Sequence, residues 1–143
     1  MKKKVIKLTE NETYSFEVIG ISSHENDYRV CWAINTELNY SLKKTDDHSI
    51  FDVKNNLKNN FSLFDYFDEE SLMTFYLVSN RNENGYLIPE LKNIDYFMLL
   101  MGETEPLFLN NFVARLKKIN IVSTAAVIDI NSLKSKKNFI LNL

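Results

Sequence analysis

The sequence predicts an α+β domain in which a largely antiparallel mixed sheet, arranged as a meander, carries two main helices on one face. Three observations lead to this class. Several segments alternate apolar and polar residues or are apolar throughout, and short turns separate them. Asn84-Gly85 is the dipeptide typical of a tight type I′ hairpin. One early and one late segment repeat their apolar residues at helical spacing.

Length and composition predict one globular domain over residues 1–143. A chain of 143 residues buries roughly 70% of its unfolded surface and can form a core without disulfides or structural metal. With 45% hydrophobic and 25% charged residues, the composition is that of an ordered protein. The net charge of -2, with lysine as the prevailing cation, argues against nucleic-acid binding. The lone cysteine, Cys31, cannot form an internal disulfide and is expected to be a buried, inert thiol.

The first residues have only the beginning of an export signal. Met1–Lys4 is basic, but the apolar stretch that follows ends at Leu8. The longest apolar run, Tyr96–Met101, is much shorter than the roughly 20 residues that cross a bilayer. We therefore expect a cytoplasmic protein without a membrane span.

The first predicted elements are strands at Lys3–Leu8 and Tyr14–Ile21. Ser22 and Glu25 then fit a capping box, in which each side chain satisfies a backbone N–H at a helix start. This pair predicts a helix from about His24 to Leu38.

The expected buried stripe of this helix includes two aromatic residues. Its members recur at three- and four-residue spacing, namely Tyr28, Cys31, Trp32 and Leu38, with Ile34 beside them. Asn39 is expected to end the helix in the left-handed conformation. A strand through Tyr28–Ile34 is the alternative, because its apolar residues also suit a buried sheet.

The middle of the chain is predicted to be rich in strands. Tyr40–Lys44 and Ser49–Val53 are short strand candidates, with Thr45–His48 as the turn between them and Lys54–Asn60 as a loop. Phe61–Phe67 follows as a strand that has aromatic residues on both faces.

The next strand is predicted at Met73–Asn82, with Met73, Phe75 and Leu77 on the face opposite Thr74, Tyr76 and Val78. Asn84-Gly85 supplies the central residues of the hairpin turn. Tyr86–Ile88 is the returning arm, which Pro89 interrupts because proline cannot donate to a ladder.

The last part of the chain is predicted to be a strand, a helix and a strand. Ile94–Met101 is apolar enough to be buried on both faces, and Pro106 suits the first turn of a helix. The apolar residues of that helix are Phe108, Leu109, Phe112, Val113 and Leu116. Ile119–Ile130 is the final strand. A right-handed crossover through the helix can pair it in parallel with the strand at Ile94–Met101. Asn131–Leu143 is either a short helix or an edge segment.

Residues 88–96 resemble a named family signature. Ile88-Pro89-Glu90-Leu91-Lys92-Asn93-Ile94-Asp95-Tyr96 is similar to the motif of the bacterial IPExxxVDY family, with Ile94 in place of the valine. Upstream, Gly20-Ile21-Ser22-Ser23 leading to Asp27-Tyr28-Arg29 is similar to the N-terminal pattern of that family. The resemblance covers nearly the whole chain. It implies a small bacterial protein and no particular activity, since the family is uncharacterised.

The signature has a functional and a structural interpretation. If the turn brings Glu90 and Asp95 close together, their repulsion raises one pKa or favours a cation, and Tyr96 completes a binding site. In the structural interpretation, which we favour, Glu90 accepts backbone N–H groups or pairs with Lys92, Asp95 holds the turn, and Tyr96 packs with its hydroxyl hydrogen-bonded. No further metal ligands accompany the pair, so we expect no metal site.

Common catalytic and nucleotide-binding motifs are absent from the sequence. It has no Gly-x-Gly-x-x-Gly, Walker, His-Glu-x-x-His or Gly-x-Ser-x-Gly pattern. His24 and His48 are expected to be exposed. Cys31 lies inside an apolar run, so we expect an inert buried thiol rather than a nucleophile that acts with either histidine. We expect no cofactor and no catalytic residue.

Aromatic residues are the remaining clue to function. They make up 13% of the chain and gather in two neighbouring strands, at Phe61, Phe64, Tyr66, Phe67, Phe75 and Tyr76. An aromatic sheet face left exposed would mark a partner site. The leading hypothesis is a non-enzymatic module that associates as a homodimer or as a subunit of an assembly. The alternative is a small-molecule-binding domain or enzyme with a site at Glu90, Asp95 and Tyr96.

Overall fold

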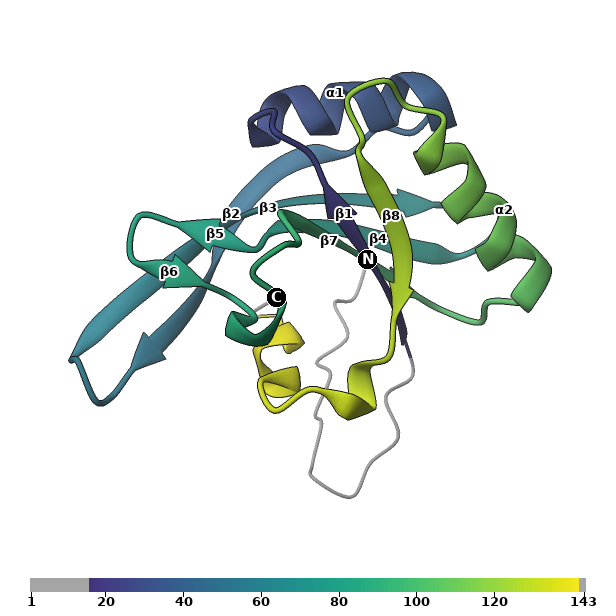
Figure 1. Ribbon diagram of the computed structural model, residues 1–143. Helices are drawn as coiled ribbons and strands as arrows, with labels where there is room; N and C mark the ends of the chain where they lie inside the picture. Colours follow the sequence, from purple (N-terminus) through teal and green to yellow (C-terminus); the bar gives the residue numbers. More distant parts are fainter. Residues whose placement is uncertain (1–15, 142–143) are drawn as a thin grey trace.

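The computed structural model describes residues 16–141 and shows a curved sheet with helices on one side (Figure 1). The predicted strand at Lys3–Leu8 lies outside the described residues, as do Tyr14 and Ser15. The six strands of the main sheet are β1 (Phe16–Ser22), β2 (Lys43–Asp52), β3 (Leu57–Asp68), β4 (Met73–Ser79), β7 (Tyr96–Met101) and β8 (Thr124–Ile128). Their order is β2-β3-β4-β7-β1-β8, and every neighbouring pair is antiparallel.

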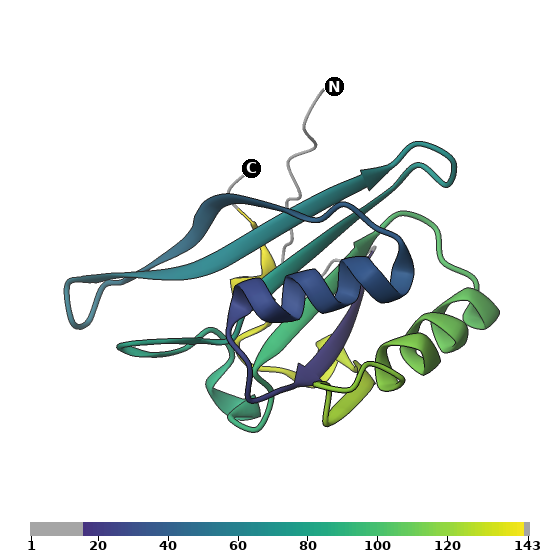
Figure 2. The same ribbon diagram turned by 90° about the horizontal axis from the view of Figure 1, so that it is seen from above.

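Two α-helices, α1 (Asp27–Leu38) and α2 (Pro106–Lys117), lie over the same face of this sheet (Figures 1 and 2). The α+β class is therefore confirmed. The smaller elements are the hairpin β5 (Arg81–Asn82) and β6 (Gly85–Tyr86), and three short 3₁₀ turns, η1 (Pro89–Leu91), η2 (Ile130–Ser132) and η3 (Lys136–Phe139).

The central strands of the sheet are buried on both faces, and each face has its own core. Under the helices, Ile19, Phe75 and Met98 from the sheet pack with residues of α1 and α2. On the opposite face, Phe97 and other strand residues pack with the C-terminal segment, whose Phe139 is fully buried. The predicted alternation in β4 and the burial of β7 on both faces are confirmed by these two clusters.

Helix α1 starts later than predicted. Its N-cap is Asn26, whose side chain accepts the Arg29 N–H at 2.9 Å, whereas Ser22 is still part of β1 and donates its hydroxyl to the Asn93 carbonyl. The predicted capping box is therefore wrong, and so is the alternative of a strand through Tyr28–Ile34. Asn39 does end the helix in the left-handed conformation, with φ 56° and ψ 44°.

The buried side of α1 also differs from the predicted stripe. Val30, Ala33 and Ile34 join Cys31 and Leu38 in the core. Tyr28 and Trp32 are instead each 63% exposed, and the Tyr28 ring meets the buried Phe64 ring edge-on at 5.5 Å between centroids. The prediction failed because large aromatic side chains are usually buried, so they were grouped with Cys31 and Leu38.

Strand β2 is one long strand rather than two short ones. The predicted turn at Thr45–His48 is a register shift within the β2–β3 pairing, and beyond it His48 pairs with Phe61. The predicted loop at Lys54–Asn60 is correspondingly short, because β3 already begins at Leu57.

The hairpin at Asn84-Gly85 exists, but its turn is shifted by one residue. Asn82 pairs with Gly85, so Glu83 and Asn84 are the central residues. Neither is among the residues of positive φ, so the turn is not type I′. The Asn82 side chain accepts the Asn84 N–H at 2.8 Å, which closes the turn locally.

The predicted parallel pair is also wrong. β7 and β8 both run antiparallel to β1, which lies between them and pairs with each. The crossover through α2 therefore skips one strand position. β8 begins only at Thr124, because Ile119–Ser123 forms turns, and the C-terminal segment consists of η2 and η3 rather than an edge strand.

Candidate functional site

The signature segment 88–96 connects β6 to β7, and the side chain of Asn80 forms hydrogen bonds to its backbone. Asn80 follows β4 and is fully buried. Its Nδ2 donates to the Leu91 carbonyl at 2.9 Å and the Ile94 carbonyl at 2.7 Å, and its Oδ1 accepts the Ile88 N–H at 2.8 Å. Both side-chain polar atoms of Asn80 are therefore used to shape the segment. Sequence reasoning missed this residue, although an asparagine directly after a strand of apolar residues was a signal.

Asp95 and Tyr96 attach the end of the signature segment to the β1–α1 connection. Asp95 Oδ1 lies 2.7 Å from the Arg81 guanidinium, and its Oδ2 accepts the Ser23 N–H at 2.8 Å. The Tyr96 hydroxyl donates to the Glu25 carbonyl at 2.7 Å. Burial, together with the negative charges of Asp27 and Asp95, raises the pKa of Tyr96 to about 12. Tyr96 therefore stays a neutral hydrogen-bond donor.

Glu90 attaches the start of the segment to a different part of the chain. Its two carboxylate oxygens accept the backbone N–H and the hydroxyl of Ser135, each at 2.8 Å. Although burial acts to raise it, these hydrogen bonds hold the pKa of Glu90 below its ordinary value. Glu90 and Asp95 thus each have their own donors, as the structural interpretation of the signature expects. Within residues 16–141, no three His, Cys, Asp or Glu side chains are grouped to hold a metal ion.

The six aromatic residues predicted to form an interface do not share one exposed face. Phe64, Tyr66 and Phe75 lie under the helices, and Phe75 stacks on Phe112 of α2 at 5.7 Å between ring centroids. Phe61 and Tyr76 lie in the core on the opposite face, and Phe67 alternates onto that side of β3 and is half-buried. The expectation of an exposed aromatic sheet face is wrong for Phe61, Phe64, Phe75 and Tyr76, which are buried. It failed because both faces of the sheet are covered.

The two histidines differ in exposure. His24 is exposed, as expected, but His48 is buried and its Nε2 lies 2.7 Å from the Asn138 carbonyl. Burial lowers the pKa of His48, while the contact with Asn138 acts in the opposite direction. The expectation that His48 lies in an exposed turn is wrong, since Thr45–His48 belongs to a strand. Cys31 is buried as predicted, and burial raises the pKa of its thiol to about 11.

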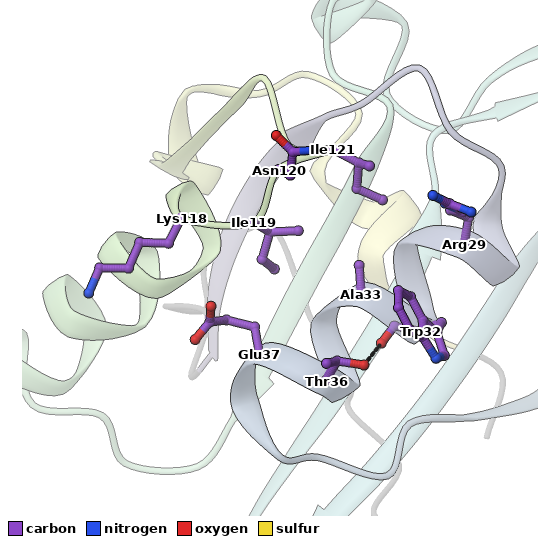
Figure 3. A pocket seen from close by; sticks show the side chains of 9 residues that line it. All are labelled: Arg29, Trp32, Ala33, Thr36, Glu37, Lys118, Ile119, Asn120 and Ile121. Carbon is purple, nitrogen blue, oxygen red and sulfur yellow. Dashed lines mark hydrogen bonds between the residues drawn. The ribbon is translucent and has the colours of Figure 1, made fainter.

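A surface hollow that the sequence did not indicate lies between α1 and the turn that joins α2 to β8 (Figure 3). Its volume is about 410 Å³. Ala33, Ile119 and Ile121 give it an apolar floor, and Trp32 stands at its edge. Nearer its rim are Arg29, Glu37 and Asn120, while Lys118 extends away from the other side chains in Figure 3.

Local contacts hold the rim in place. Arg29 lies 3.5 Å from Glu25 one turn earlier in the chain, and Arg115 of α2 lies 3.7 Å from the Glu37 carboxylate. The same Arg115 donates to the Glu37 carbonyl, so it connects the two helices beside the hollow. A second hollow of about 410 Å³ follows between the end of α1 and α2, and Lys118 lines both.

No helix in the part of the chain that the structure describes is long and apolar enough to cross a membrane. No family model, no curated protein and no solved structure matches this chain.

Proposed function

We propose that this protein is a non-enzymatic association module that binds a protein partner through the surface around Trp32. One observation carries the proposal. Trp32 is 63% exposed at the edge of a hollow whose floor is apolar. An indole in water next to an unfilled apolar surface loses contacts that a partner side chain can supply.

The composition of this surface supports a protein partner. Tryptophan, tyrosine and arginine dominate the binding energy of protein interfaces, especially where they surround a pocket and are ringed by polar groups. Trp32 and Tyr28 are the exposed aromatic residues of α1, and Arg29 lies between them in sequence. The apolar floor with charged groups at the rim has the arrangement of a small interface core.

In this proposal the signature segment supports the fold. Asn80, Glu90, Asp95 and Tyr96 direct their polar atoms to neighbouring parts of the chain. If the chain is a member of the IPExxxVDY family, as the resemblance implies, the signature is a structural motif of a bacterial protein. We place that protein in the cytoplasm, where the single thiol of Cys31 suits a reducing environment.

The proposal is tested with the fluorescence of Trp32, which is the only tryptophan of the chain. The free protein is expected to show the red-shifted, easily quenched emission of an exposed indole. Partners are captured from the native host on the wild type, on Trp32→Ala and on Leu72→Ala, a control at a residue that is 71% exposed. A purified partner should shift the emission to the blue and should bind the Leu72 variant but not the Trp32 variant. Capture that is indifferent to Trp32 would contradict the proposal.

A further inference from the structure

The two surface hollows are parts of one groove on the helix side of the sheet. The first, which we call the Trp32 hollow, and the second, beside the end of α1, have Lys118 in common. Glu37 lines the Trp32 hollow, and Arg115 of α2, which lies 3.7 Å from its carboxylate, lines the second hollow. A contact between the helices is therefore the boundary of the two hollows. We call both hollows together the helix groove, and one partner segment can reach both at once.

Each hollow of the helix groove offers apolar surface to a partner. In the Trp32 hollow this surface is the exposed indole beside an apolar floor. In the second hollow Phe112 is buried, and its ring centroid lies 6.2 Å from that of Tyr40 and 6.0 Å from that of Phe108. Phe108 is 36% exposed, and Leu38 completes the apolar lining. Both hollows therefore suit apolar side chains.

One positive charge in the helix groove is not compensated within the described part of the chain. Arg29 lies 3.5 Å from Glu25, and Arg115 contacts Glu37, so each of these arginines has a carboxylate partner. Lys118 forms no such ion pair with any residue that the structure describes. Its side chain leads away from the Trp32 hollow and over α2 (Figure 3). The helix groove therefore has a cation between two apolar sites.

We propose that the helix groove binds an amphipathic helical segment of a protein partner, which places one apolar side chain in each hollow and a carboxylate between them at Lys118. This inference rests on the function proposed for the Trp32 surface and names the chemistry of the partner. A groove between two helices takes the apolar face of a third helix in a common mode of peptide recognition. The carboxylate follows from charge complementarity, because the uncompensated charge of the groove is positive.

The spacing of the two hollows suits a helical segment. Ala33 lines the Trp32 hollow, and Leu38, five residues later on α1, lines the second hollow. Five residues of α-helix rise about 8 Å. Residues two turns apart on a partner helix are separated by about 10 Å, so their side chains reach both hollows. A residue one turn after the first lies between them on the same face, where it meets Lys118.

A set of short, alanine-rich helical peptides is the probe that tests this inference. Each peptide has two leucines two turns apart and a glutamate between them on the same face, and a matched set has lysine in place of the glutamate. Binding is followed by the anisotropy of a dye on the peptide and by the blue shift of Trp32 emission. The glutamate set is expected to bind about 10-fold more tightly, because an attractive contact with Lys118 replaces a repulsive one. Equal binding of the two sets, or no binding of the glutamate set, overturns the inference.

Charge reversal tests whether the carboxylate lies at Lys118. Lys118→Glu is expected to reverse the preference, so that the lysine peptides bind more tightly than the glutamate peptides. Lys117→Glu is the matched control, because Lys117 is the preceding exposed residue and lines neither hollow. This control is expected to keep the preference of the wild type. If both variants change the preference equally, the peptides respond to the overall charge of the helix end, and the contact at Lys118 is overturned.

Two further variants test the apolar side chains of the partner. Trp32→Ala is expected to weaken binding of the glutamate peptides at least about 30-fold in Kd. Ala114 lines the second hollow, so Ala114→Gln places a polar side chain there and is expected to reduce the affinity to that of peptides with one leucine. Asn110→Gln, at an exposed residue of α2 that lines neither hollow, is the control. If Ala114→Gln binds as tightly as this control, the second hollow takes no part and the inference fails.

The outcomes separate this inference from the function on which it rests. A purified host partner that is lost on Trp32→Ala, but that Lys118→Glu binds as tightly as the wild type does, keeps the proposed function and overturns the acidic helix. A host partner that Trp32→Ala retains overturns both.

Other occupants of the helix groove give results of their own. A wild-type dimer that Trp32→Ala dissociates makes a second copy of the chain the occupant. Single-stranded RNA that displaces the peptides makes a nucleic acid the occupant. Blue emission of Trp32 in the free monomer means that the chain itself fills the Trp32 hollow. Each of these results overturns the acidic partner helix.

Discussion

Glu90 and Ser135 are 45 residues apart in the chain and form two hydrogen bonds, from the Ser135 backbone N–H and hydroxyl to the two oxygens of one carboxylate. The contact joins η1 to the C-terminal segment. That segment covers one face of the sheet through Leu133, Phe139 and Leu141. The exposed Glu90 carboxylate therefore helps to attach the C-terminal segment to the core on that face of the sheet.

We expect Glu90→Gln to lower the free energy of unfolding by about 1 kcal/mol, because an amide replaces a charged acceptor at a solvent-exposed site. Urea unfolding measures the change, and Glu103→Gln, an exposed carboxylate elsewhere, is the control. The pKa of Glu90 is lowered in the folded state, so its contribution is present above the ordinary value of 4.5 and is lost as the pH falls through the folded value. A stoichiometric metal in the wild type that the variant loses would overturn the structural role.

Asn80→Ala is expected to be the more damaging change. The substitution removes the partners of the Ile88 N–H and of the carbonyls of Leu91 and Ile94. Unsatisfied buried groups cost about 1–3 kcal/mol each, so we expect a loss of about 3 kcal/mol or more in unfolding free energy. Denaturant titration measures this loss, and Asn110→Ala on the exposed side of α2 should cause none. A loss below about 1 kcal/mol would mean that water replaces the amide.

The faces of the central strands could be predicted from the sequence because alternation follows directly from strand geometry. Met73, Phe75 and Leu77 share one face of β4 since their burial drives them to the same core. Likewise, Asn39 and Pro106 mark helix ends through their own backbone preferences, without help from distant residues.

Features that depend on distant contacts could not be predicted in this way. Ser22 suits an N-cap as well as Asn26 does, but β1 continues through Ser22 because it pairs with β8. Whether Phe61 and Tyr76 are exposed depends on the C-terminal segment, which packs on their face of the sheet. Contacts from Glu90 and His48, distant in sequence, attach that segment. The Trp32 hollow needs the turn at Ile119–Ile121 beside α1, and no local pattern places it there.

Cys31 should be unreactive until the protein opens. The thiol is buried, and desolvation followed by the charge of Asp27 raises its pKa to about 11, so almost no thiolate exists at neutral pH. We expect modification by a chromogenic disulfide reagent to follow the population of unfolded protein as urea is added. Thr36→Cys, which adds an exposed thiol on the same helix, should react at once. Equal rates for the two thiols would mean that α1 opens readily.

His48 makes the attachment of the C-terminal segment sensitive to pH. The Asn138 carbonyl can only accept, so His48 Nε2 carries the hydrogen. Among the described residues its Nδ1 has no partner, although that atom is buried. Protonation would place a charge and an unsatisfied donor there, which is why burial lowers the pKa of His48 below its ordinary value of 6.5.

Because the unfolded chain binds this proton more readily, His48 leaves stability intact above pH 6.5 and reduces it as the pH falls below that value. His48→Gln keeps a donor for the Asn138 carbonyl but cannot be protonated. In the difference in unfolding free energy between wild type and variant, the pH-dependent contributions of the carboxylates present in both proteins cancel. We expect this difference to be constant above pH 6.5 and then to move against the wild type by up to about 1.4 kcal/mol per pH unit. If the two plots of unfolding free energy against pH stay parallel down to pH 5, His48 takes up its proton in the folded protein as easily as in the unfolded chain. That result would mean that the C-terminal segment does not shield His48 from water.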